Sequence, residues 1–163
     1  MQRRFAGGEL GRQERLIIMS RDSAPPPATY VAASGGIFRD MTIHDFDMAR
    51  SMLGDIVGVS AVGANSFSAE MAEAGDFDSA VVTPRAANGA VATIINSRHS
   101  AFGYDQRIEA FGSDGMLQAT NVPSSSVLVS GASGSPDFED GRAALILADA
   151  AQLSATTGRP VAV

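Results

Sequence analysis

The sequence contains no lysine and no cysteine, and each absence excludes a class of chemistry. All 12 basic residues are arginine, so no group in the chain can act as a lysine base, form a Schiff base or bind a phosphate through a lysine. The lack of cysteine excludes disulfides, thiolate catalysis and thiolate metal ligands, and it is consistent with a reducing compartment. We therefore expect a cytoplasmic protein.

Long apolar runs and an excess of positive charge are also absent. No stretch approaches the roughly 18–20 apolar residues that a membrane helix needs, and LIIM at 16–19 is too short for the apolar part of a signal peptide. The formal net charge of −6 argues against a surface that neutralises nucleic-acid phosphates. The sequence thus predicts neither a membrane partner nor a nucleic-acid partner.

The composition that remains, 45% apolar and 18% charged over 163 residues, is typical of one globular domain with a buried core. Three consecutive prolines predict a loop over residues 22–33. Helical periodicity predicts helices over 37–53 and 143–153. Apolar or alternating runs, two of them flanking the Asn88-Gly89 turn, predict strands at 14–21, 56–62, 78–83, 90–95, 106–111, 116–119, 127–129 and 161–163. The predicted class is α+β, with an open-faced, predominantly antiparallel sheet and about two helices packed on one face.

Most of the polar groups with chemical potential lie in one stretch, SGGIFRDMTIHDFDMARSMLG at 34–54. In a helix, Asp40 and His44 share one face and Asp47 lies three residues further on. A carboxylate beside an imidazole can orient the ring and stabilise its protonated form, so that the ring takes a proton from a substrate hydroxyl. The same spacing also occurs on helix surfaces where acids are merely solvated. This pattern alone leaves both interpretations open.

Other polar groups give less specific patterns. A metal site on Asp40, His44 and Asp47 would require His99 as well, and no known ligand spacing links these residues. No metal is therefore expected. A metal-dependent lyase or isomerase remains only as a third hypothesis, after the two that are given below. Residues 103–107, GYDQR, suit a polyhydroxylated ligand, although a hairpin edge has the same composition. Residues 97–99 are interpreted as a solvated strand end or as a pocket wall.

The stretch at 34–54 resembles the substrate-domain helix of the Gfo/Idh/MocA oxidoreductase family, most closely its bacterial inositol 2-dehydrogenases. The resemblance extends through SRDSAPPP, GDFDSAVVTPRAANGAVATIINSR, GYDQRIEAFGSDGMLQATN and the final EDGRAALILADAAQLSATTGRPVAV. It implies one C-terminal substrate-binding and oligomerisation domain over residues 1–163, trimmed at its start and shortened around 130–139. It also implies an open-faced sheet through which subunits form an oligomer.

The resemblance assigns roles to five residues. Asp40 and His44 match the family's catalytic residues: His44 would take the hydroxyl proton as hydride leaves the substrate carbon for a nicotinamide, and Asp40 would orient the site. Tyr104 resembles a substrate-contacting tyrosine, and Arg21 and Asp22 lie where the family has a substrate-facing loop. The full-length family enzymes use NAD or NADP, bound by a Rossmann domain that this sequence lacks together with the family's catalytic lysine.

These inferences predict the substrate-binding half of an NAD(P)-dependent enzyme that resembles inositol 2-dehydrogenase. Such an enzyme oxidises a secondary alcohol of a cyclitol or sugar, and this chain is expected to be inactive alone and to bind no cofactor tightly by itself. The expected partners are the polyol, a second copy of the chain and a separate Rossmann-domain chain. The alternative is a non-enzymatic module that binds polyols or pairs with related subunits.

Overall fold

The strands form one mixed sheet in the order β6-β5-β1-β4-β3-β2-β7. The computed structural model describes residues 8–121 and 138–163. All neighbouring strands pair antiparallel except β1 and β4, which pair parallel. The strands are β1 (Gln13–Arg21), β2 (Ile56–Ala64), β3 (Ser79–Ala86), β4 (Val91–Ser97), β5 (Asp105–Gly112), β6 (Gly115–Thr120) and β7 (Val161–Ala162). The predicted α+β class with a mostly antiparallel sheet is confirmed.

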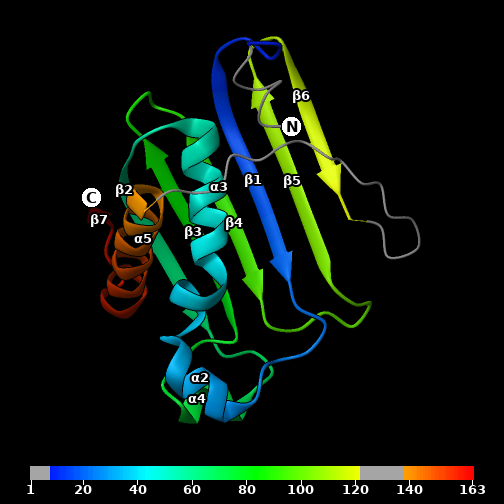
Figure 1. Ribbon diagram of the computed structural model, residues 1–163, viewed down its shortest axis with the longest axis vertical. Helices are drawn as coiled ribbons and strands as arrows, with labels where there is room; N and C mark the ends of the chain where they lie inside the picture. Colours follow the sequence, from blue (N-terminus) through cyan, green and yellow to red (C-terminus); the bar gives the residue numbers. More distant parts are fainter. Residues whose placement is uncertain (1–7, 122–137) are drawn as a thin grey trace.

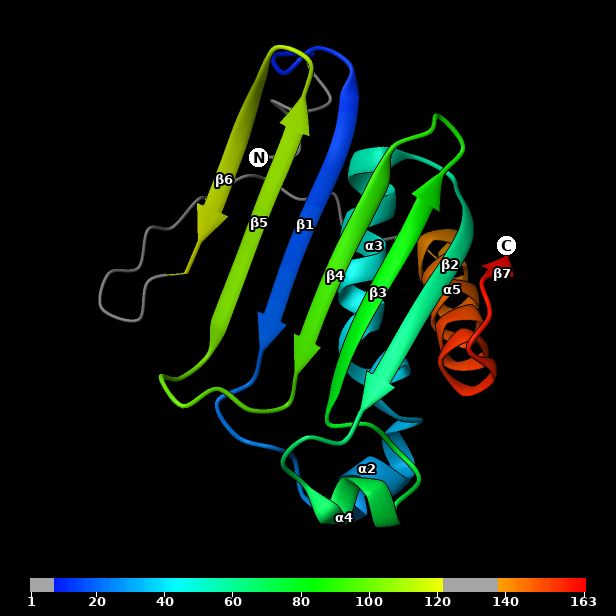
Figure 2. The same ribbon diagram turned by 180° about the vertical axis from the view of Figure 1, so that it is seen from behind.

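Two long helices cover one face of this sheet. They are α3 (Ile43–Leu53), which continues a π-helical turn at Phe38–Thr42, and α5 (Phe138–Thr157). Both lie in front of the strands in Figure 1, and Figure 2 shows the other face with no described helix over it. Two short helices, α2 (Ala28–Ser34) and α4 (Ala69–Glu73), lie together beyond one end of the sheet. The predicted arrangement of about two helices on one face is therefore confirmed.

The core lies between the sheet and the two long helices. Along β1, Leu16 and Ile18 are buried against the helices, while Ile17 and Met19, which alternate with them, lie on the open face, as the two-residue period of a strand requires. Helix α5 contributes small buried residues such as Ala148 and Ala151, which allow it to pack closely on β2. Helix α3 contributes Phe46, which is fully buried. This packing fixes the position of α3 over the sheet.

The segment after the three prolines differs from the prediction of a loop over 22–33, because residues 28–34 form α2. Proline removes backbone donors, but the first N–H groups of a helix have no intrahelical acceptor, so proline is compatible with the position just before a helix. The Pro27 carbonyl accepts hydrogen bonds from the backbone N–H groups of Tyr30 and Val31 at 2.9 and 3.2 Å. Gly35, with a φ of +84°, ends the helix in the left-handed conformation that glycine allows.

The two predicted hairpins are present as β3–β4 and β5–β6. In the first turn only Gly89 has a positive φ, of +89°, so the turn differs from the tight two-residue type expected for Asn88-Gly89. The strand predicted at 127–129 and most of the segment predicted to be shortened, 130–139, lie outside the described residues. No helix in the described part of the chain is both long and apolar enough to span a membrane.

Candidate functional site

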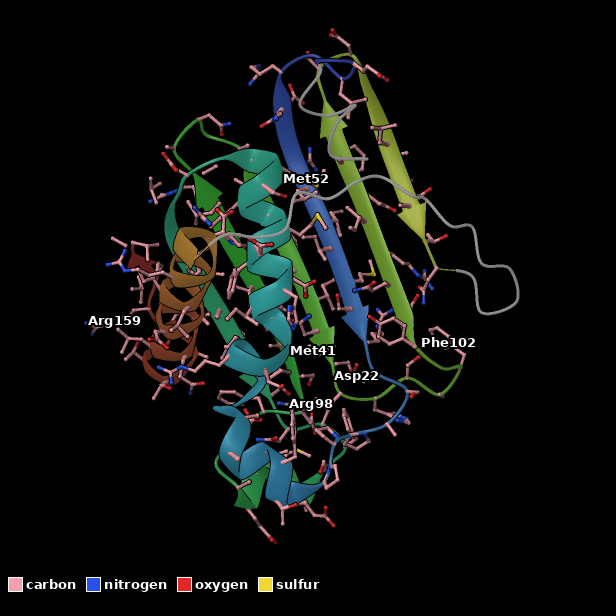
Figure 3. The ribbon with its side chains drawn as sticks, in the orientation of Figure 1. Asp22, Met41, Met52, Arg98, Phe102 and Arg159 are labelled. Carbon is pink, nitrogen blue, oxygen red and sulfur yellow. The ribbon has the colours of Figure 1, made fainter. Side chains whose placement is uncertain are left out.

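A cavity of about 310 Å³ opens beside the end of β1, on the face of the sheet that the helices cover. In Figure 3 the labelled side chains of Asp22, Met41 and Arg98 lie together at this position, between α2, α3 and β1. Four of the five residues predicted for the site line the cavity, and they are Asp22, Asp40, His44 and Tyr104. Gln106 and Arg98, from the segments 103–107 and 97–99 that the sequence indicated less specifically, also line the cavity, and the structure adds Ser20, Tyr30 and Asp45.

Asp40 lies in the π-helical turn, and both of its carboxylate oxygens have partners. The Tyr30 hydroxyl donates to Oδ1 at 2.6 Å, and Arg98 Nη1 donates to Oδ2 at 2.9 Å. The hydrogen bond to the carboxylate raises the pKa of Tyr30, because it stabilises the neutral phenol. Among the described residues no hydrogen bond joins Asp40 to His44, although both residues line the cavity.

Arg98 is a buried cation, 1% exposed, directly after β4. Its Nη1 pairs with Asp40, and its Nη2 pairs with Asp76 Oδ2 at 3.1 Å. The other oxygen of Asp76 accepts a hydrogen bond from the backbone N–H of Ile37 at 2.9 Å. Gly36 has a φ of +87°, and a Cβ atom there would lie 2.8 Å from Asp76 Oδ1, so only glycine allows this approach. Arg98 thus connects the start of the π-helical turn to Asp76 and fixes Asp40 in the cavity wall.

Asp45 is 4% exposed and lies on the first turn of α3, directly after His44. Ser20 Oγ donates to its Oδ1 at 2.8 Å, and Asn96 Nδ2 donates to its Oδ2 at 2.7 Å. The other end of the Asn96 amide accepts a hydrogen bond from Thr42 Oγ1 at 2.6 Å. Burial raises the pKa of Asp45, and the hydrogen bonds from Asn96 and Ser20 and the nearby charge of His44 oppose this rise only in part.

The side chains of His44, Asp22 and Tyr104 line the cavity without a hydrogen bond to any described residue. Burial raises the pKa of Asp22; the charge of Arg98 opposes this rise and that of Asp40 adds to it. The pKa of Tyr104 is raised by burial and by the carboxylates of Asp22 and Asp45, so its hydroxyl remains a donor at neutral pH. Together these groups offer an imidazole, a carboxyl group and a phenol, a set that suits a ligand with several hydroxyl groups.

Arg21, the fifth predicted residue, does not line the cavity. Successive residues of a strand point to opposite faces, so Ser20 faces the cavity while Arg21 faces the open side of the sheet. Arg21 Nη1 donates to Asp105 Oδ2 at 2.5 Å, and Arg107 Nε donates to Asp105 Oδ1 at 2.9 Å. Burial would raise the pKa of Asp105, but these two arginines hold it below its usual value. The predicted contact of Arg21 with a substrate finds no support in this geometry.

The described residues do not form a metal site or a dinucleotide site. No group of three acidic or histidine side chains within 8–121 and 138–163 is placed to hold a metal ion, and the His99 ring lies 5.3 Å from that of Phe67. Strands β1 and β2, which precede and follow α3, are separated in the sheet by β4 and β3. They therefore do not form the adjacent βαβ unit with a glycine-rich turn that binds the pyrophosphate of NAD. The described residues thus contain no Rossmann-type dinucleotide-binding unit.

Several proteins that are similar in sequence or structure to this chain are named as inositol dehydrogenases, and each is longer than this chain. A myo-inositol 2-dehydrogenase from Thermotoga maritima is 51% identical over 123 residues, which are 75% of this chain and 37% of that protein. A scyllo-inositol 2-dehydrogenase (NAD(+)) from Bacillus subtilis is 35% identical over 144 residues, 85% of this chain and 42% of that protein. The crystal structure of a myo-inositol dehydrogenase from Corynebacterium glutamicum is similar with a TM-score of 0.92 and 44% identity, over 99% of this chain and 60% of that one.

The chain therefore spans between 37% and 60% of the length of these relatives. The family model described as GFO/IDH/MocA C-terminal domain matches residues 1–118. The expected family is thus confirmed, and the matched residues include α3 and every strand that borders the cavity. The chain belongs to the GFO/IDH/MocA family, as a C-terminal domain.

Proposed function

We propose that the chain is the substrate-binding half of an NAD(P)-dependent dehydrogenase that oxidises a secondary alcohol of a cyclitol such as inositol. The observation that supports this most directly is the cavity of about 310 Å³ into which Asp22, His44 and Tyr104 present polar atoms without described partners. Inositol has a hydroxyl group on each of its ring carbons, and each hydroxyl both donates and accepts. The names of the relatives from Thermotoga maritima and Bacillus subtilis agree with this substrate class.

In this proposal each cavity residue has a defined task. An imidazole nitrogen of His44 takes the proton of the hydroxyl group that is oxidised. Asp40, fixed by Tyr30 and Arg98, keeps the cavity wall beside this hydroxyl in one geometry, and Tyr104 and Asp22 bind other hydroxyl groups. A bound nicotinamide would supply the hydride acceptor, and a separate Rossmann domain would provide the cofactor site and a catalytic lysine.

The purified chain of 163 residues is expected to show no inositol-dependent reduction of NAD or NADP. The reason is that its described residues form no dinucleotide site and its sequence has no lysine. The measurement is the absorbance of reduced nicotinamide with myo-inositol or scyllo-inositol as substrate. Turnover by the chain alone would contradict the proposal, and activity that appears only after a lysine-bearing Rossmann domain is added would support it.

The chain is nevertheless expected to bind inositol weakly, with a Kd on the order of 1 mM or above, because the polyol contacts belong to this half of the site. Tyr104→Phe removes one donor and His44→Gln replaces the imidazole, and each change is expected to weaken binding about 5- to 10-fold, as the loss of one hydrogen bond does. The measurement is a titration of the chain with scyllo-inositol followed by NMR chemical shifts. Phe102→Leu, at an exposed residue outside the cavity lining, is the control. Equal binding by all four proteins would sink the assignment of the pocket.

A role in subunit pairing has a separate observation in its favour. On the open face, Val62 and Val81 are 67% and 47% exposed and lie opposite each other in neighbouring strands. Ile95 continues this row from Val81 into β4, and Met19 continues it into β1. We call these four residues the apolar row. Because it crosses a face without a described helix (Figure 2), we propose that two copies of the chain pair through this face.

A further inference from the structure

Asn121, the residue directly after β6, binds the backbone of the segment that carries Tyr104 and Gln106. Its side-chain Oδ1 accepts a hydrogen bond from the backbone N–H of Gln106, and its Nδ2 donates to the backbone carbonyl of Tyr104 at 2.9 Å. Its own backbone N–H donates to the carbonyl of Gln106 at 3.0 Å. Tyr104 and Gln106 line the cavity, whereas Asn121 does not. Asn121 therefore holds this segment of the cavity wall from outside the cavity.

The residue between these two is anchored on the opposite side of the sheet. Successive residues of a strand point to opposite faces, so the side chains of Tyr104 and Gln106 lie on the cavity side and that of Asp105 lies on the open face. The carboxylate of Asp105 accepts hydrogen bonds from Arg21 at 2.5 Å and from Arg107 at 2.9 Å. The backbone of 104–106 is thus held from both faces of the sheet.

The side-chain amide of Gln106 lines the cavity and has no hydrogen-bond partner among the described residues, although Asn121 binds both backbone groups of the same residue. Ser20, which lies opposite Gln106 in β1, already donates its hydroxyl hydrogen to Asp45. A primary amide has an acceptor and a donor side by side. Two hydroxyl groups on adjacent carbons present a matching donor and acceptor, so the free amide suits a vicinal diol.

We propose that Gln106 is a specificity-determining residue whose amide binds two adjacent hydroxyl groups of the polyol, and that Asn121 is a positioning residue that holds Gln106 and Tyr104 in place for this contact. The inference rests on the proposed function, because it concerns the same cavity. Such a contact distinguishes inositol, in which every hydroxyl group has a neighbour, from a polyol whose hydroxyl groups are separated by unsubstituted carbons.

Titration of the whole chain with myo-inositol, followed by NMR chemical shifts, tests the contact of Gln106. Gln106→Leu removes both the donor and the acceptor, and we expect the Kd to rise about 10- to 30-fold, as the loss of two hydrogen bonds does. For a cyclohexanetriol with hydroxyl groups on alternate ring carbons, the expected rise is about 5-fold or less. Gln118→Leu, the same change at an exposed residue of the neighbouring strand β6, is the control and is expected to leave both Kd values unchanged.

Asn121→Ala tests the positioning role, with Asn88→Ala as a matched control. The Asn88 side chain also binds two backbone groups, since it donates to the Leu53 carbonyl at 3.1 Å and accepts from the Ala90 N–H at 2.9 Å. It lies in the β3–β4 turn, at the end of β4 that is remote from the cavity (Figure 1). We expect both substitutions to lower the Tm, but only Asn121→Ala to raise the Kd of myo-inositol, by about 5- to 10-fold.

Two further variants separate positioning from general stability. In a chain that already carries Gln106→Leu, Asn121→Ala is expected to raise the Kd less than about 3-fold, because most of the contact that it positions is gone. Asn121→Asp keeps the acceptor for the Gln106 N–H and loses the donor to Tyr104. It is expected to raise the Kd about 2- to 5-fold, and it replaces the alanine variant if that variant does not fold.

The outcomes separate this inference from the proposed function. If wild type binds myo-inositol, an unchanged Kd in Gln106→Leu, or an equal rise for both polyols, would overturn the role of Gln106 alone. A rise in Kd that is the same for Asn121→Ala and Asn88→Ala would overturn the positioning role. A wild-type chain that binds neither polyol would overturn the proposed function together with this inference.

Discussion

Replacement of Arg98 by methionine is expected to lower the free energy of unfolding by roughly 3–5 kcal/mol, as the loss of one partner from a buried ion pair does. The reason is that Asp40 and Asp76 remain 17% and 5% exposed but lose the cation between them. Methionine fills much of the same volume, so the loss comes from the unpaired carboxylates more than from a cavity. Urea unfolding measures the effect as a lower midpoint at an unchanged slope.

Arg39→Met is the matched control for this change. Arg39 also pairs with an aspartate, Asp149, at 2.6 Å, but both side chains are about half exposed, at 48% and 50%. Exposed ion pairs of this kind contribute about 0–1 kcal/mol. The double variant Arg98→Met/Asp76→Asn is expected to recover part of the loss, because one of the two unpaired charges is then gone. Equal losses for Arg98→Met and Arg39→Met would show that Arg98 does not act as a buried ion-paired residue.

Val81→Asp is expected to separate paired copies of the chain and to raise the dimer Kd roughly 100-fold or more. In a two-fold interface each substitution occurs twice, so two carboxylates would be buried against apolar side chains. The folded monomer itself is expected to tolerate the change, because Val81 is 47% exposed on the open face of β3. Sedimentation velocity over a range of protein concentrations gives the dimer fraction for wild type and variant.

Leu145→Asp provides the control, since Leu145 has a similar exposed fraction of 41% but lies on α5, on the helix-covered side of the sheet. It is expected to leave the dimer Kd unchanged. A wild-type chain that stays monomeric at all concentrations would rule out pairing through the apolar row. A Val81→Asp chain that still dimerises with the wild-type Kd would assign the contact to a different surface.

The sheet could be predicted because strands have a simple two-residue period. The order of strands and the parallel pairing of β1 with β4 depend on contacts between distant segments, which no local pattern contains. The long helices were also predicted, but the π-helical turn at the start of the first of them was not. The π-helical turn at Phe38–Thr42 changes the helical phase, and a sequence pattern that assumes a constant 3.6-residue period cannot include such a change.

The candidate site was predicted only in part, for a similar reason. Asp22, Asp40, His44 and Tyr104 were indicated by their residue types and by the resemblance to a family, and the fold brings all four to one cavity. Arg98 is separated from Asp40 by 58 positions, so its ion pair could not be derived from spacing, and a solvated strand end was an equally good interpretation. For Asp45, the only local indication in the sequence that it belongs to the site was its position directly after His44.

The π-helical turn limits how the length of this helix can vary. A π turn holds one residue more than an α turn, so the segments on its two sides are rotated by about 100° relative to a continuous α-helix. Phe38 and Thr42 within the turn and Phe46 after it are all buried, while Asp40 faces the cavity. Removal of one residue would straighten the helix and turn either the buried side chains or Asp40 away from their partners. Insertions and deletions in homologues are therefore expected in the flanking loops and not between Gly36 and His44.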